Sequence, residues 1–185
     1  TRFKQGNSAL DCGSGDIYDN GNGSLMRMLP IVFYLYNNEF SELEEIEIIN
    51  NISSLTHKHE ISCLGCKIYC DYVKQLLNGI DKKIAIKNIQ NKDYSSYYSY
   101  KSINEYRRIL IGDISKLTID EIKSSGYVVD TLEASLWCTL NSNSYEGAVS
   151  KAVNLGNDTD TIGAITGSLN GIIYGKDNIP MNWLN

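Results

Sequence analysis

The sequence predicts an all-α fold. Apolar residues recur at helical spacing in several stretches, and Ser, Thr and Asp stand at positions typical of helix N-caps. No segment alternates apolar and polar residues as a half-buried strand would. The 185 residues contain neither an internal repeat nor a clear interdomain linker. We therefore expect one compact helical domain over residues 1–185.

The first elements follow from glycine, proline and capping signals. Residues 11–24 are dominated by Gly, Asn, Asp and Ser, which predicts a loop. Pro30 lacks an amide hydrogen and should bend or restart the helix in the apolar run around it. Ser41 and Glu44 have the spacing of a capping box. A helix is expected from about residue 42 to residue 57.

A second helix is expected over 59–78, since Asn78 and Gly79 form a typical helix end. A weaker, Ile-rich helix should occupy the eighties. The polar, tyrosine-rich segment 92–101 is interpreted as a loop or a poorly defined connector. Further helices are expected from Asp130 onward and over 145–153.

Composition and charge exclude several classes of protein. The chain has 17 Lys and Arg against 22 Asp and Glu, and its lysines are scattered, which argues against a nucleic-acid partner. No apolar run approaches the roughly 20 residues of a membrane helix. No secretory signal is visible, and an odd count of five cysteines favours reduced thiols. We expect a cytoplasmic protein with no membrane partner.

The most informative motif is Asp-x-Asp-Thr at Asp158, Asp160 and Thr161. Two carboxylates and a hydroxyl are the hard oxygen ligands that magnesium and calcium prefer. A helix N-cap would explain Asp158 but would leave the other two without a role. A calcium-binding EF-hand is rejected, because Ile162 and Leu169 stand where such a loop needs oxygen ligands. The motif predicts half of a magnesium site.

Three glycines follow this motif at every fourth position, namely Gly163, Gly167 and Gly171. They share one face of a helix, although each glycine costs about 1 kcal/mol relative to alanine in a helix interior. Close approach by another helix is the usual reason for such a row. The row is interpreted as a packing signal.

A second cluster has the residue types of a zinc site: His57, His59, Cys63, Cys66 and Cys70. Its last four members share a helix face whose ends lie about 16 Å apart, at 1.5 Å of rise per residue. Zinc holds its ligands within about 2.3 Å, so one helix cannot supply all four. We expect these cysteines to pack toward other helices and to carry no metal.

Four blocks of the sequence resemble the ADP-ribosylglycohydrolase family, of the type that includes the dinitrogenase-reductase-activating enzymes. The blocks, in order, are NGNGSLMRMLP at 20–30, SSLTHKHEIS at 53–62, SSGYVVDTLEASLWC at 124–138 and AVNLGNDTDTIGAITG at 152–167. IPMNWL at 179–184 also resembles the usual end of the family. The resemblance thus covers nearly the whole chain.

The resemblance implies a compact orthogonal helical bundle around two Mg²⁺ or Mn²⁺ ions. Its activity would be hydrolysis of the bond between ADP-ribose and an acceptor, such as an arginine or serine side chain. Asp158, Asp160 and Thr161 would supply the carboxy-terminal half of the metal site. The expected substrate-binding residues are Asn22, Gly23, Ser24 and Met26 as a backbone cradle for diphosphate and ribose, His57 in the same cleft, and Tyr127 stacked on adenine.

The chain departs from the family in one respect. Members carry a Thr-Asp-Asp-Thr segment and a catalytic acidic residue before the NGNG block, and neither motif is present here. We therefore interpret the chain as the carboxy-terminal portion of a member, as a fragment, a processed product or a degenerate form. The catalytic residue is then unknown. A non-catalytic ADP-ribose binder and a purely structural protein of the same fold, as in related crystallins, stay open as alternatives.

Overall fold

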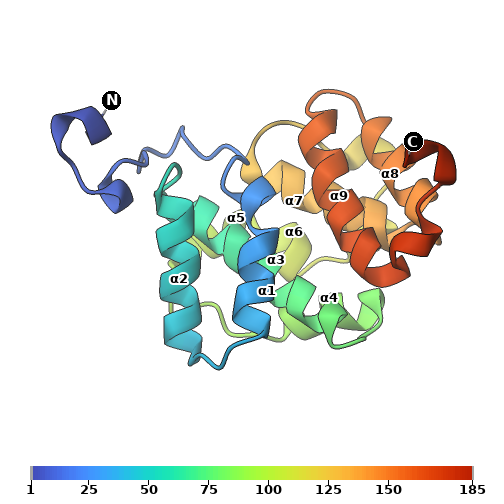
Figure 1. Cartoon of the computed structure of the whole chain (residues 1–185), viewed down its shortest axis with the longest axis horizontal. Helices are drawn as coiled ribbons and strands as arrows, with labels where there is room; N and C mark the ends of the chain where they lie inside the picture. The colour runs from blue at the N-terminus through green and yellow to red at the C-terminus, as the bar shows by residue number, and fades with distance from the viewer. Residues whose placement is uncertain (1, 185) are drawn as a thin grey trace.

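The computed structural model describes residues 2–184, and it shows helices joined by loops and short 3-10 turns (Figure 1). In this range the extended pairing consists of two isolated bridges, one between Ser14 and His57 and one between Gly21 and Tyr127. The predicted all-α fold is confirmed. None of the helices in the described range is long and apolar enough to cross a membrane.

The α-helices are α1 Leu29–Tyr36, α2 Glu42–Ser54, α3 Glu60–Leu77, α4 Lys82–Gln90, α5 Tyr100–Glu105, α6 Arg107–Leu110, α7 Val128–Leu140, α8 Tyr145–Val153 and α9 Thr159–Tyr174. The 3-10 turns are η1 Arg2–Gln5, η2 Ala9–Asp11, η3 Leu25–Arg27, η4 Ile114–Lys116, η5 Ile119–Glu121, η6 Lys176–Asn178 and η7 Met181–Trp183. In Figure 1 the amino-terminal end of the chain, around η1, extends away from the helical body.

Local signals set several of these boundaries. Pro30 lies in the first turn of α1, directly after η3, so the chain restarts its helix there. Ser41 accepts a hydrogen bond from the Glu44 amide, and the Glu44 carboxylate accepts one from the Ser41 amide at 2.7 Å, which completes the predicted capping box of α2. The His59 ring accepts a hydrogen bond from the Ile61 amide and caps α3.

The start of α7 corrects one prediction. The helix begins at Val128 rather than at Asp130, because the Tyr127 carbonyl already accepts the hydrogen bond of the Thr131 amide at 2.9 Å. The Asp130 carboxylate accepts instead from the Ser125 hydroxyl at 2.6 Å. Asp130 therefore lies inside the first turn of α7.

The tyrosine-rich segment is better defined than its sequence indicates. Tyr94 and Tyr98 are each only 5% exposed. Tyr94 donates to the Asp71 carboxylate at 3.1 Å and Tyr98 donates to the Asn50 side chain at 3.0 Å. Packing against α2 and α3 fixes this segment, and Tyr100 already belongs to α5.

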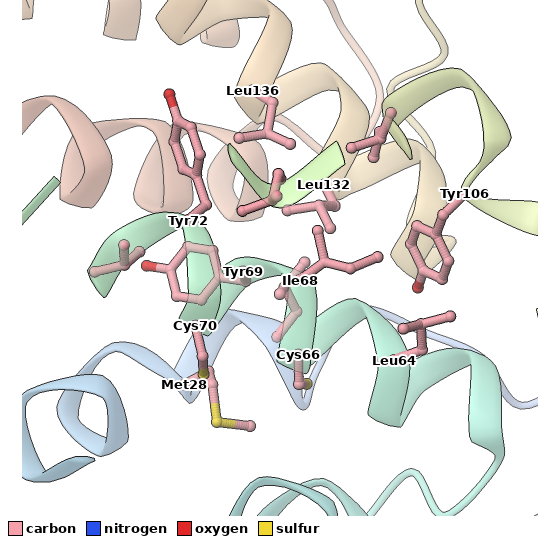
Figure 2. Packing of buried hydrophobic residues seen from close by; sticks show 14 of the residues in the cluster. Met28, Leu64, Cys66, Ile68, Tyr69, Cys70, Tyr72, Tyr106, Leu132 and Leu136 are labelled. Carbon is pink, nitrogen blue, oxygen red and sulfur yellow. The ribbon is translucent and has the colours of Figure 1, made fainter. Parts of the chain in front are cut away.

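The core is organised around α3, which contacts α1, α2, α4, α5, α7 and α9. Figure 2 shows Leu132 and Leu136 of α7 on one side of α3, and Met28 beside Cys70 on the other. Cys63, Cys66 and Cys70 are buried in this core, as predicted from their shared face. The core packing thus fixes α3 and α7, and the first turn of each helix borders the candidate functional site.

Candidate functional site

The loop of the NGNG block is fixed to the start of α7 by main-chain hydrogen bonds. The Asn22 amide donates to the Gly126 carbonyl, and the Val128 amide donates to the Asn20 carbonyl, both at 3.0 Å. These bonds form the short antiparallel bridge between Gly21 and Tyr127. Two blocks that lie a hundred residues apart in the sequence are thus paired.

The Asn22 side chain extends this connection to α9. It is 9% exposed, and its amide group donates to the Thr131 hydroxyl at 2.8 Å and to the Asp158 carboxylate at 2.5 Å. The Asp158 amide donates to the Ser124 carbonyl at 3.1 Å. The start of α9 is therefore attached to both the NGNG loop and the segment before α7.

The Asp-x-Asp-Thr motif lies at the first turn of α9. Asp158 occupies the N-cap position, but its side chain makes no capping hydrogen bond, so helix capping does not account for it. The Asp160 carboxylate is exposed. Its pKa is lowered, mainly by the neighbouring Asp158 carboxyl and less by the backbone amides of Thr161 and Asp160. Thr161 is 8% exposed. Two carboxyls and a hydroxyl-bearing residue therefore stand together beside Asn22.

Over residues 2–184 the structure gathers no cluster of three or more His, Cys, Asp and Glu side chains with the arrangement of a metal site. The metal-binding potential of the motif is accordingly that of a partial site, with oxygen donors on Asp158, Asp160 and Thr161. Their role as metal ligands stays a prediction.

His57 reaches the same loop from the segment between α2 and α3. A Cβ atom on Gly21 would lie 3.2 Å from the ring Nε2, and one on Gly23 would lie 2.9 Å from the ring Cε1. The ring Nδ1 lies 2.7 Å from the Thr56 hydroxyl. Burial, together with the nearby Arg27 charge, lowers the pKa of His57. The imidazole is consequently neutral at pH 7.

An open cleft of about 550 Å³ lies beside this ring. Its lining residues are Cys12, Ser14, Tyr18, Asp19, Gly21, Thr56 and His57. The cleft thus joins the loop of residues 11–24 to the segment that carries His57.

The remaining predicted residues take different positions in the loop. Within residues 2–184 the Gly23 and Ser24 amides have no hydrogen-bond acceptor, whereas the Met26 amide donates to the Asn22 carbonyl at 3.0 Å. The Ser24 side chain is buried and accepts from the Cys66 thiol at 3.6 Å. The Met26 side chain is 57% exposed. Of the four residues predicted as a backbone cradle, Asn22 and Met26 use their amides inside the protein.

Tyr127 is half-buried at the N-terminus of α7. Its hydroxyl donates to the Glu105 carboxylate at 3.1 Å, which fixes the outer end of the ring. Its neighbour Gly126 lies close to the Asp158 carboxylate, since a Cβ at Gly126 would be 3.3 Å from Oδ2. Tyr127 is therefore placed at the edge of the same site.

Several residues that build the site were not predicted individually. Asn20, Ser124, Gly126 and Thr131 position the loop, the start of α7 and the start of α9 by the bonds described above. All four lie inside the blocks that carry the family resemblance. A buried polar role cannot be read from their residue types, because Ser, Asn and Gly are equally typical of exposed turns.

Fold and site together define an all-α protein in which a glycine-rich loop lies against the His57 ring beside an open cleft, and is bonded through Asn22 to the carboxyl of Asp158. Residues 1–185 match the family model of ADP-ribosylglycohydrolase. The chain belongs to the ADP-ribosylglycohydrolase family.

Individual relatives agree with this assignment. The chain is 32% identical over 174 residues to ADP-ribosylarginine hydrolase Tri1 of Pseudomonas putida (strain GB-1), an alignment that covers 93% of this chain and 43% of the relative. It is 35% identical over 134 residues to ADP-ribosylarginine hydrolase Tri1 of Serratia proteamaculans (strain 568), in an alignment that covers 71% of this chain and 34% of that relative. It is 28% identical over 171 residues to ADP-ribosyl-[dinitrogen reductase] glycohydrolase of Rhodospirillum rubrum, in an alignment that covers 90% of this chain and 50% of that relative. The chain thus spans half or less of these relatives.

A solved structure described as an ADP-ribosylglycohydrolase-related protein complex has the same fold. It superposes with a TM-score of 0.75 at 24% identity, over 99% of this chain and 64% of that chain.

Proposed function

We propose that this chain forms the carboxy-terminal half of a site that hydrolyses ADP-ribose from a modified protein. The observation that carries the proposal is the hydrogen bond between Asn22 and Asp158, which unites the loop and the Asp-x-Asp-Thr motif across 136 residues of sequence. The relatives support it, because they are described as hydrolases of ADP-ribosylarginine and of ADP-ribosylated dinitrogen reductase.

The donor set fits one side of a Mg²⁺ or Mn²⁺ site. Asp158 and Asp160 place two carboxyls in the first turn of α9, close enough for Asp158 to influence the pKa of Asp160. Such a pair repels itself when both groups are ionised, and a divalent cation offsets that repulsion. When bound, the ions would orient ribose hydroxyls and neutralise charge. Two ions of near-octahedral coordination need more ligands than Asp158, Asp160 and Thr161 provide.

The chain's own residues suit the other parts of ADP-ribose. The amide of Gly23, a partly exposed residue, would donate to the diphosphate, as main-chain amides do in anion-binding loops. The neutral His57 ring can accept or donate a hydrogen bond to a ribose hydroxyl. Tyr127, held by Glu105, would offer its ring to adenine.

Binding of ADP-ribose without hydrolysis is the second candidate, and one observation favours it. The Asp158 carboxylate is engaged with Asn22, and the Asp160 carboxylate with the amides of its own turn. If Asp158 and Asp160 hold the metal, residues 2–184 offer no third His, Cys, Asp or Glu clustered with them to act as a general base for water. In the hydrolase a further acidic residue, from the amino-terminal part that the family relatives carry, would act as the general base.

The two candidates are separated by measuring binding and turnover together. The 185-residue chain would be compared with the same chain preceded by the corresponding amino-terminal region of the Pseudomonas putida relative. We expect both to bind ADP-ribose in calorimetry with Mg²⁺ present. We expect the extended form to release labelled ADP-ribose from arginine-modified protein far faster than the short form.

A serine-modified substrate run in parallel would identify the acceptor. Absence of ADP-ribose binding by both forms would contradict the proposal. Equal turnover by both forms, abolished in the short form by Asp160→Ala, would place the catalytic residues within this chain.

A further inference from the structure

Asn20 is a buried side chain beneath the loop, with only 3% of its surface exposed. Its amide nitrogen donates to the Ile17 carbonyl at 2.8 Å and lies 3.1 Å from the His59 Nδ1. Its amide oxygen accepts from the Ser62 amide at 3.2 Å and from the Ser62 hydroxyl at 2.8 Å. Two donors and two acceptor sites are the full capacity of this side chain, and all are used.

Two of these contacts make Asn20 a second cap for α3. The first amides of a helix have no partner inside the helix. The His59 ring accepts from the Ile61 amide, and the Ser62 amide, which also donates to the His59 carbonyl at 3.0 Å, donates to Asn20 from 42 residues further along the chain. The loop is thereby attached to the first turn of α3, which begins at Glu60, three residues after His57.

The main chain of Asn20 makes the other connection. Its carbonyl accepts from the Val128 amide, in the bridge that holds the loop against α7. Asn20 thus lies at the point where the His57 segment, the loop and the start of α7 are joined. No other side-chain type supplies two donors and two acceptors in this volume, so Asp and Ala would each leave buried groups without partners.

We propose that Asn20 is a positioning residue, which holds the NGNG loop in the conformation that binds ADP-ribose. This inference rests on the proposed function, since it concerns the same site. Asn20 acts through its neighbours: it sets where the Gly23 amide and the Asn22 side chain stand relative to His57 and Asp158. Without it, the loop would populate its binding-competent position only part of the time, and apparent affinity falls by that fraction.

The test compares Asn20→Ala with Asn170→Ala. Asn170 is also buried, at 0% exposure, and donates two hydrogen bonds, to the Thr139 hydroxyl and the Thr166 carbonyl. It lies in α9 twelve residues beyond Asp158, about 18 Å along the helix axis. Both substitutions remove a buried amide that donates two hydrogen bonds, and Asn20 also accepts two, so Asn170→Ala controls for the loss of a buried amide rather than for the whole loss of stability. Urea unfolding would define conditions in which both variants are folded.

Under these conditions we expect Asn20→Ala to raise the Kd for ADP-ribose about tenfold, and Asn170→Ala to leave it within a factor of two. A second measurement needs no ligand: the imidazole resonances of His57 should shift in Asn20→Ala and stay in place in Asn170→Ala.

Equal Kd values and equal His57 resonances in the two folded variants would overturn the positioning role. If the unaltered chain fails to bind ADP-ribose, the proposed function fails, while the His57 resonances still report whether Asn20 holds the loop. A change of those resonances in Asn20→Ala alone supports the positioning role in either case.

Discussion

At the scale of single residues, the His57 ring packs against two glycines, in the space that a side chain at either position would fill. Gly21 and Gly23 both lie against it. Neither has a positive φ, so these glycines are explained by close approach rather than by backbone conformation. The ring is partly withdrawn from water, and this burial is the main cause of its lowered pKa.

A substitution at Gly23 tests this arrangement. In Gly23→Ala the new methyl group would stand 2.9 Å from the ring carbon and push the imidazole toward the open cleft. Greater hydration should then raise the His57 pKa toward its usual value. Titration followed by NMR would measure it. Gly15→Ala is the matched control in the same loop, because a Cβ there meets no atom within 4 Å. An unchanged His57 pKa in Gly23→Ala would count against the close contact.

At the scale of elements, the glycines of α9 serve helix packing. Cβ atoms built on Gly163 and Gly167 would approach Val153 and Tyr145 of α8 within 3.3 and 3.2 Å, and one on Gly171 would stop 4.0 Å from Tyr145. The predicted reason for the row, close approach of another helix, is confirmed. The requirement for glycine weakens toward the end of α9.

Two glycine substitutions should have opposite effects on stability. A Cβ on Gly65 of α3 would overlap the Tyr106 hydroxyl, which donates to the Ile61 carbonyl at 2.8 Å. Gly65→Ala should lower the free energy of unfolding by about 1–3 kcal/mol through overpacking. Gly171→Ala should raise it by up to about 1 kcal/mol, because alanine is the better helix former. Urea denaturation measures both, and a Gly65→Ala protein as stable as the original would contradict the packing.

The end of α7 is stabilised by a lysine from α4. Lys82 donates to the Thr139 carbonyl at 2.9 Å and also to the Ser142 carbonyl, and these groups otherwise lack helical partners. Lys82→Met should cost about 1–2 kcal/mol of stability. Lys83→Met is the control, because Lys83 is exposed and, within residues 2–184, only its backbone amide, which donates to Asp81, makes a hydrogen bond beyond the main chain of α4. Similar thermal midpoints for the two variants would show that this cap contributes little.

At the scale of the whole molecule, the candidate site connects elements from both ends of the described chain. The loop before α1, the segment before α3, the start of α7 and the start of α9 all contribute to it. A ligand that contacts several of these segments at once opposes their separation. Its binding energy should therefore appear as stability of the entire fold.

This coupling leads to a prediction with Mg²⁺ and ADP-ribose together. At a ligand concentration one hundred times Kd, the unfolding free energy should rise by about 2.7 kcal/mol. Asp160→Asn should remove much of that gain, whereas Asp120→Asn, an exposed Asp in η5, should retain it. Differential scanning fluorimetry with and without a chelator measures both. Equal gains in the two variants would show that Asp160 does not hold the metal.

The sequence by itself determined the family and most of the longer helices, but not α5 and α6. Helices close hydrogen bonds between residues four apart, so the Ser41 capping box, the end of α3 at Asn78 and the restart at Pro30 could all be predicted locally. It also identified the blocks that contain Asn22, His57 and Asp158.

Only the tertiary structure decided how these blocks meet. Three hydrogen bonds illustrate this, from Asn22 to Asp158, from Ser62 to Asn20 and from Tyr94 to Asp71. They join residues between 23 and 136 positions apart. Nothing in the local pattern of an Asn or a Tyr shows which distant group will be its partner. That choice is made when the core around α3 closes, because a buried polar side chain must then find its hydrogen bonds among whatever elements the packing brings beside it.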